Sequence, residues 1–190
     1  MIRMKNISKS FGEKQIFRDF SADIPEGKTT CLTGVSGSGK TTLLRILSGL
    51  ETLDAGEIIG LSERRLSVVF QEDRLCENLS PISNVRLAAP SGTTRESIRS
   101  GMTSIGLSDC EKQPVRELSG GMRRRVAILR ALFAQYDFLL LDEPFKGLDE
   151  ESKRQTISFI KEHAMDMTIL LITHDHLDAA AMGTTVEIRL

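Results

Sequence analysis

The chain has 190 residues, a formal net charge of −1 at pH 7, and a composition that is 40% hydrophobic and 27% charged. These values are ordinary for a globular domain, and the near-zero charge argues against nucleic acid or anionic lipid as the main partner. Three cysteines without metal-binding spacing indicate reduced thiols in a cytoplasmic protein. No apolar run approaches the roughly 20 residues of a membrane-spanning helix, and the charged N-terminus is not typical of a signal peptide.

The first part of the chain predicts a β layer followed by a strand, a loop and a helix. Residues 2–24 contain two strand-like runs and predict an antiparallel layer. Residues 28–34 predict a strand that enters a glycine-rich loop, and residues 41–50 predict the amphipathic helix that follows. This succession favours an α/β fold.

The later apolar runs predict strands that are buried on both faces, as in a parallel sheet with helices on each side. These runs are residues 67–70, 138–142 and 168–173. Residues 150–164 and 175–182 predict helices between and after them. The chain ends on a strand-like run at Leu190, so no C-terminal regulatory domain is expected.

The segment 78–117 lacks the signal of a buried strand. It is polar, contains three prolines and has short helical stretches. We therefore expect a single domain, 1–190, whose α/β core (1–77 and 118–190) carries a small inserted helical subdomain (78–117).

The stretch GVSGSGKTT matches the pattern G-x-x-x-x-G-K-[ST] between a predicted strand and a predicted helix. Glycines let successive backbone N–H groups turn toward a phosphate, and the helix N-terminus adds its positive end. Lys40 is expected to reach the β- and γ-phosphate oxygens, and the Thr41 hydroxyl to bind Mg²⁺. The expected phosphate-binding residues are Gly34, Val35, Ser36, Gly37, Ser38, Gly39, Lys40, Thr41 and Thr42.

Polar residues follow three of the predicted buried strands. Asp142 and Glu143 end one strand, where α/β sheets bind ligands, so Asp142 is expected to hold Mg²⁺ and Glu143 to act as the general base. His174 follows another strand and is expected to contact the γ-phosphate, although His174 with His176 leaves a zinc site as an alternative. Gln71 follows a third strand, and its amide can bind both a metal ion and a water.

A second glycine pair, in LSGGMRRRVAILRAL (118–132), precedes a helix with four arginines. Two interpretations of these arginines remain open: a local basic patch, or a solvated helix face.

Together these motifs resemble the nucleotide-binding subunits of ABC transporters, in the family's order and over about residues 2–186. The family's elements are a phosphate loop at 34–42, a Q-loop at Gln71, a signature at 118–122, a D-loop at 147–149 and an H-loop at His174. The resemblance implies ATP and Mg²⁺ as cofactors and ATP hydrolysis as the activity, with Gln71 a further Mg²⁺ ligand.

The resemblance also implies how two such subunits meet. Ser119, Gly120 and Gly121 would bind the γ-phosphate of ATP held by the partner subunit, in a head-to-tail homodimer or pseudo-dimer, with Asp149 also near the nucleotide. Phe11 would stack on adenine, where the family commonly has tyrosine. Two further departures are Met122, at the usual glutamine of the signature, and a short interval between Lys40 and Gln71, which suggests a trimmed β layer.

Finer resemblance points to the ATPases of the nitrate, sulfonate and taurine importers. It implies polytopic membrane permease subunits as partners, a solute-binding protein as an indirect one, and a location on the inner face of the cell membrane. A bacterial importer is favoured over an exporter. The alternative is a soluble single-cassette ATPase that acts as an assembly or scaffold factor.

Overall fold

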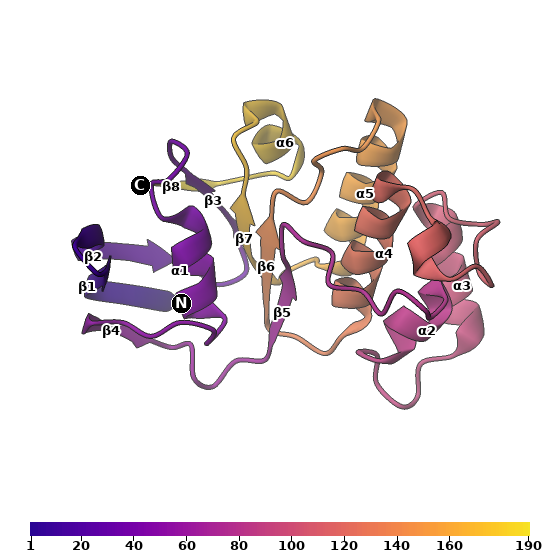
Figure 1. Ribbon diagram of the computed structural model, residues 1–190, viewed down its shortest axis with the longest axis horizontal. Coiled ribbons are helices and arrows are strands. Elements are labelled where there is room, and N and C mark those ends of the chain that lie inside the picture. Colours follow the sequence, from indigo (N-terminus) through magenta and orange to yellow (C-terminus); the bar gives the residue numbers. More distant parts are fainter. The chain divides into compact units, whose positions relative to one another are not determined.

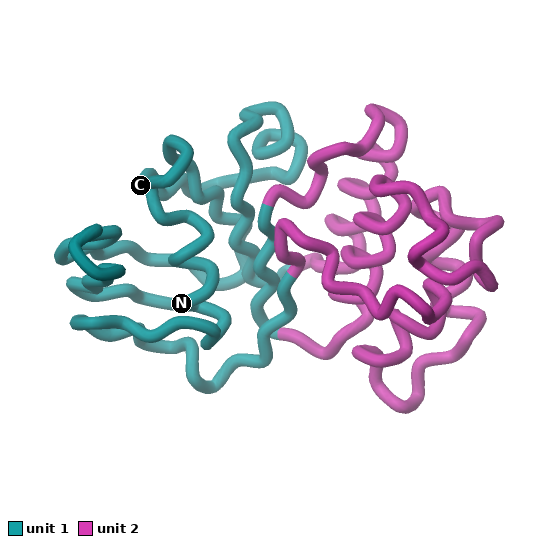
Figure 2. Tube along the Cα trace, in the orientation of Figure 1, with its two compact units in different colours: residues 1–68, 137–142, 166–190 teal, residues 69–136, 143–165 magenta.

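The computed structural model describes all residues from 1 to 190. The chain divides into two compact units, shown in teal and magenta in Figure 2. Unit 1 comprises Met1–Val68, Asp137–Asp142 and Asp166–Leu190, and unit 2 comprises Val69–Tyr136 and Glu143–Met165. Each unit is described by itself.

Unit 1 begins with a three-stranded antiparallel sheet in the order β2-β1-β4. The strands are β1 (Ile2–Phe11), β2 (Lys14–Ile24) and β4 (Ala55–Ile59). The first two form the layer expected for residues 2–24, whereas β4 was not predicted. Its sequence, AGEII, carries little strand signal, and Gly56, with φ +88°, lies against the backbone of β1.

The second sheet has five strands in the order β5-β6-β7-β3-β8. They are β3 (Thr29–Thr33), β5 (Leu66–Val69), β6 (Phe138–Asp142), β7 (Thr168–Ile172) and β8 (Val186–Arg189). The pairs β6–β7, β3–β7 and β3–β8 are parallel. Every residue of β6 and β7 is buried, as their continuous apolar sequences require. The expected α/β class with a mainly parallel sheet is confirmed.

Two helices of unit 1 follow strands of this sheet (Figure 1). Helix α1 (Lys40–Leu47) comes after β3, and α6 (His176–Ala181) comes after β7. Helix α1 ends earlier than predicted because Gly49, with φ +72°, donates its N–H to Ile46 O and turns the chain away.

Unit 2 is mainly helical (Figure 1). It contains α2 (Pro81–Arg86), α3 (Arg95–Ser104), a 3₁₀ turn η1 (Val115–Glu117), α4 (Gly120–Phe133) and α5 (Glu150–His163). The α-helices are capped by side chains that accept backbone N–H bonds, those of Ser80, Thr94, Ser119 and Asp149.

The segment expected as a helical subdomain holds α2, α3 and η1, but unit 2 as a whole also includes α4 and α5. The boundaries 78–117 therefore stay a prediction. No helix of the chain is both long enough and apolar enough to span a bilayer.

Candidate functional site

The loop between β3 and α1 has the backbone that the glycine pattern predicts. Gly37 and Gly39 have φ angles of +81° and +103°, a region that glycine adopts without strain. At Gly39 the constraint is also steric, because a Cβ there would lie 2.6 Å from Ile16 Cγ2 and 2.8 Å from Phe17 Cζ. A Cβ on Gly37 would meet nothing within 4 Å, so at this residue the loop presents open backbone to a ligand.

The N-terminus of α1 lacks a side-chain cap. Gly39 occupies the N-cap position and offers no acceptor, so the first-turn N–H groups receive no side-chain bond. Lys40 Nζ donates to Gly34 O at 2.7 Å and to Val35 O at 3.0 Å, which places its charge over the loop. Ser38 Oγ is buried without a hydrogen-bond partner. These groups together suit an anion such as a phosphate.

Unit 1 also places His174 beside this loop. His174 is exposed and lies just after the carboxyl end of β7, which ends at Ile172. A cavity of about 320 Å³ is lined by His174 and His176 together with Gly34 and Val35. Within this unit His174 therefore lies beside the loop, and its expected contact with a γ-phosphate stays a prediction.

The residues expected to bind Mg²⁺ in this unit are oxygen donors, which is the ligand type that this ion prefers. Asp142 is the last residue of β6 and is 3% exposed, and Thr41 is exposed in the first turn of α1. No group of three or more histidine, cysteine, aspartate or glutamate side chains is arranged to hold a metal ion. One carboxylate and one hydroxyl are donors that suit Mg²⁺ shared with substrate phosphates, because such ions take only one or two carboxylates from the protein.

Phe11 lies at the end of β1 and is 48% exposed, so its ring is accessible for stacking. Lys9 Nζ lies 5.0 Å from the centroid of this ring. Lys9 is itself almost buried and forms ion pairs with Glu51 at 2.9 Å and Asp54 at 3.3 Å. The bond to Glu51 raises the pKa of Lys9, which keeps the charge beside the ring. Sequence reasoning missed this lysine.

In unit 2, Glu143 has an unusual backbone. Its φ is +46°, in the left-handed region that non-glycine residues rarely adopt, and such strain collects at functional sites. Glu143 O accepts a bond from Lys146 N at 3.2 Å, which closes the turn after Asp142.

Asp149 serves as the N-cap of α5. Its Oδ1 accepts from Ser152 N at 2.9 Å, and this bond lowers the pKa of its carboxyl group. The structure thus assigns Asp149 a local role in addition to the expected one near a nucleotide.

The two glycines of the signature differ in their surroundings. A Cβ on Gly120 would meet no atom within 4 Å, whereas a Cβ on Gly121 would lie 3.3 Å from Gly147 O in the same unit. Ser119 Oγ caps α4 by accepting from Met122 N at 3.3 Å. Gly120 therefore leaves open space for a ligand, and Gly121 is also needed for packing within the chain.

Two arginines of α4, Arg124 and Arg125, belong neither to a solvated face nor to a free basic patch. Arg124 is 6% exposed and donates to Phe70 O at 2.6 Å and to Gln71 O. Arg125 donates to Ile105 O at 2.7 Å. Both open interpretations of the sequence are wrong for these residues, because backbone carbonyls distant in sequence accept their N–H groups.

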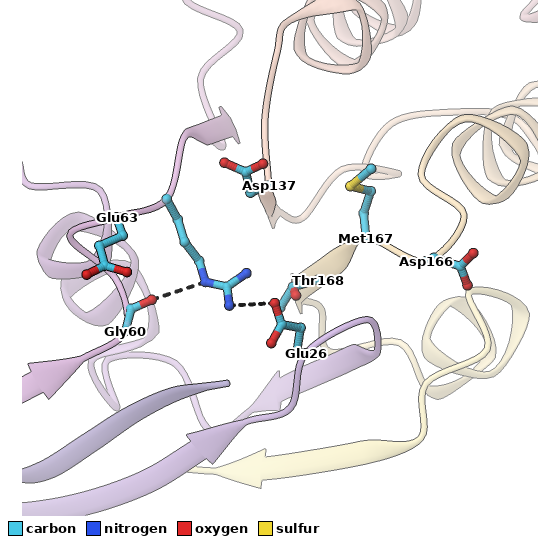
Figure 3. Close-up of a pocket in the computed structure, with 8 residues that line it drawn as sticks. Glu26, Gly60, Glu63, Asp137, Asp166, Met167 and Thr168 are labelled. Carbon is cyan, nitrogen blue, oxygen red and sulfur yellow. Dashed lines mark hydrogen bonds and ion pairs between the residues drawn. The ribbon is translucent and has the colours of Figure 1, made fainter.

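A second cavity of unit 1, of about 440 Å³, lies at the opposite, amino ends of β6 and β7 (Figure 3). Glu26, Glu63, Asp137, Asp166 and Arg64 contribute its charges. Arg64 Nη2 bonds to Glu26 Oε1 at 2.7 Å, and its Nε bonds to Gly60 O at 3.1 Å. None of the site residues expected from the sequence lines this cavity.

Comparisons with known proteins cover almost the whole chain. A family model described as ABC transporter matches residues 17–146. The aliphatic sulfonates import ATP-binding protein SsuB 3 of Rhodococcus jostii (strain RHA1) is 36% identical over 190 residues, which are 98% of this chain and 70% of that protein.

A second curated relative is the sulfate/thiosulfate import ATP-binding protein CysA of Neisseria meningitidis serogroup A. It is 32% identical over 207 residues, which cover 98% of this chain but 58% of that protein. Among solved structures, a dimeric structure of MJ0796, described as a bacterial ABC transporter cassette, matches with a TM-score of 0.85 and 25% identity. That match covers 100% of this chain and 94% of the other.

Proposed function

This chain belongs to the ABC transporter family and is an ATP-binding ATPase subunit, and we propose that it powers a bacterial importer through ATP-dependent, head-to-tail pairing of two such subunits. The named relatives are import ATP-binding proteins, and one matching cassette structure is dimeric. This similarity, over 98% of the chain, favours transport over the alternative of a scaffold or assembly factor. Membrane permease subunits would be the partners at the inner face of the cell membrane.

The observation that carries the proposal is the presence of two glycine-flanked helix N-termini in one chain. The N-terminus of α1 has no side-chain cap, and that of α4 has open space at Gly120. Each presents N–H groups and the positive end of a helix dipole, which favours phosphate. Two such N-termini in one chain are explained if they serve two different ATP molecules. The loop before α1 would bind the ATP of its own subunit, and the N-terminus of α4 would contact the ATP of the partner subunit.

The residue roles follow from the same proposal. Lys40 and the loop would bind the β- and γ-phosphates, and Phe11 would stack on the base. Glu143 would accept the proton of the attacking water, and His174 would bond to the γ-phosphate. Asp149 would lie near the paired nucleotide.

Thr41, Asp142 and Gln71 would hold Mg²⁺ through oxygen atoms. The bound ion would supply positive charge that offsets the negative charge on the phosphate oxygens.

Glu143→Gln tests the catalytic part of this proposal. Glutamine keeps the size of the side chain but cannot accept the proton, so kcat should fall by roughly 10²–10⁴-fold while ATP still binds. Steady-state phosphate release and binding of a fluorescent ATP analogue measure the two quantities. Lys40→Ala is the contrasting variant. It removes the positive charge that would face the phosphates, so it should weaken the binding of ATP. Turnover of Glu143→Gln at the wild-type rate would exclude Glu143 as the base.

A further inference from the structure

Residues 70–74, which follow β5, accept hydrogen bonds from arginines of α4 at their backbone carbonyls. Arg124 Nη1 donates to Phe70 O at 2.6 Å, and Arg124 Nη2 donates to Gln71 O. Its Nη1 also lies 3.4 Å from Asp73 Oδ1. The Arg124 side chain is 7% exposed, so water does not compete freely for these contacts. All of these residues belong to unit 2.

Arg123 and Arg130, also on α4, contact the same segment at other atoms. Arg130 donates to Arg74 O at 2.8 Å and to Asp73 O at 3.2 Å, farther along the segment. Arg123 instead pairs with side chains, its Nη2 lying 3.1 Å from Glu77 Oε1. Arg124 is the arginine of α4 whose bonds reach the two carbonyls that flank the Cα of Gln71.

These two carbonyls determine the conformation of Gln71. The Phe70 carbonyl belongs to the peptide plane before the Gln71 Cα, and the Gln71 carbonyl belongs to the plane after it. Because each peptide unit is planar, the orientations of the two planes set φ and ψ of Gln71, and with them the direction of its Cα–Cβ bond. A guanidinium group suits this task, since its N–H donors form a rigid, planar fork.

We propose that Arg124 is a positioning residue that fixes the backbone of Gln71 and thereby aims its side chain. For the role of Gln71 in turnover, the inference rests on the proposed function. Arg124 lies about one turn into α4, the helix that begins at Gly120. A ligand bound at the N-terminus of α4 would therefore act on the same rigid helix that holds Gln71.

Arg124→Lys is the decisive variant. Lysine keeps the positive charge near Asp73, but its single ammonium group cannot reproduce the planar fork that binds both carbonyls. Arg124→Ala removes the charge as well. Arg123→Ala is the matched control on the same helix, because it deletes an arginine that contacts side chains instead of these carbonyls.

The first measurement needs no nucleotide. Cys31 and Cys110 are each 2% exposed, so a nitroxide label at Glu72→Cys in a Cys76→Ser background would react at one accessible thiol. Electron paramagnetic resonance should show a new mobile component in Arg124→Lys and Arg124→Ala, and a spectrum like that of the labelled parent in Arg123→Ala. Circular dichroism checks that each variant is folded. An unchanged spectrum in Arg124→Lys, or an equal change in Arg123→Ala, would overturn the proposal.

The second measurement is a double-mutant cycle on ATP turnover. Arg124→Lys should lower kcat by about 10- to 100-fold, the cost of a misplaced group, with a smaller change in KM for ATP. Combined with Gln71→Ala, it should cause little further loss, because both variants remove the same positioned side chain. If the fold-losses in kcat of the two single variants multiplied in the double variant, Arg124 would act independently of Gln71 and the inference would be overturned. If Gln71→Ala alone left kcat unchanged, the role proposed for Gln71 would fail, whereas the label spectra would still decide whether Arg124 holds the segment.

Discussion

At the scale of single residues, His174 is a site residue whose neighbours the structure defines. It lies after β7 and lines a cavity with Gly34 and Val35 of the phosphate loop. An imidazole in that place can donate a hydrogen bond to a γ-phosphate oxygen as negative charge shifts during hydrolysis. His176 lines the same cavity and belongs to the first turn of α6, which makes it a natural comparison.

His174→Ala should lower kcat by roughly 10²–10³-fold, the usual cost of losing one donor to a transition state. His176→Ala, in the same cavity, should stay within a few-fold of the wild type. Elemental analysis of the purified protein addresses the zinc alternative. Stoichiometric zinc that disappears in either variant would show that the two histidines bind a metal ion and would contradict the proposed contact.

At the scale of elements, an ion pair ties the start of β6 to the residues before β5. Arg65 Nη2 bonds to Asp137 Oδ1 at 2.9 Å and its Nε to Asp137 Oδ2 at 3.1 Å, while Arg65 N donates to Oδ2 at 3.0 Å. Asp137 N in turn donates to Arg65 O at 2.8 Å. These bonds, led by that of the Arg65 side chain, lower the pKa of Asp137 from 3.8 to about 2.

This lowered pKa predicts how stability depends on pH. The Asp137 carboxylate stabilises the folded state fully above its unfolded pKa of 3.8, and this contribution is lost as the pH falls toward about 2. The free energy of unfolding should therefore be lower for Asp137→Asn than for the wild type at pH 5–7, and the difference should shrink below pH 4. Urea unfolding over this pH range measures it. In an Arg65→Gln background, Asp137→Asn should lower the free energy of unfolding by much less. If the difference in free energy between wild type and Asp137→Asn does not vary with pH, the stabilising role of the Asp137 carboxylate is contradicted.

At the scale of the whole molecule, the proposed function requires two chains to close on ATP. The two glycines of the signature are not equivalent for testing this requirement. Gly121 packs near Gly147 O of its own chain, so a side chain there disturbs the monomer as well as a dimer. Gly120 faces open space, and a side chain there changes only what approaches from outside.

The Glu143→Gln protein should be mostly monomeric without nucleotide or with ADP, and should dimerise with millimolar ATP. Adding Gly120→Asp should abolish the dimer, because a carboxylate would meet the γ-phosphate at the N-terminus of α4. Gly92→Asp is the matched control, since a Cβ at Gly92 also meets nothing within 4 Å. Sizing chromatography with light scattering reports the mass. A dimer that forms equally well with Gly120→Asp would contradict docking of the signature on a partner's ATP.

Much of the fold could be predicted because its signals are local. The five-residue runs of β6 and β7 are apolar enough to indicate burial on both faces, and the structure buries every residue of them. The glycines between β3 and α1 indicated a loop, and Gly37 and Gly39 have the left-handed φ angles that glycine adopts without strain. Such features depend on neighbouring residues alone, so periodicity and residue type are sufficient to find them.

What the sequence determined by itself is therefore the α/β class, the order of most strands and helices, and the family, whereas phosphate binding by residues 34–42 stays a prediction. The tertiary structure decided what the arginines of α4 bind, which glycine of the signature is open, and that residues 55–59 form a strand. The partners in these cases are backbone atoms far along the chain, as with Arg124 and Phe70, which are 54 residues apart. Every residue carries the same carbonyl group, so residue type gives no sign of which carbonyl a distant guanidinium will bind. Only folding brings the two together.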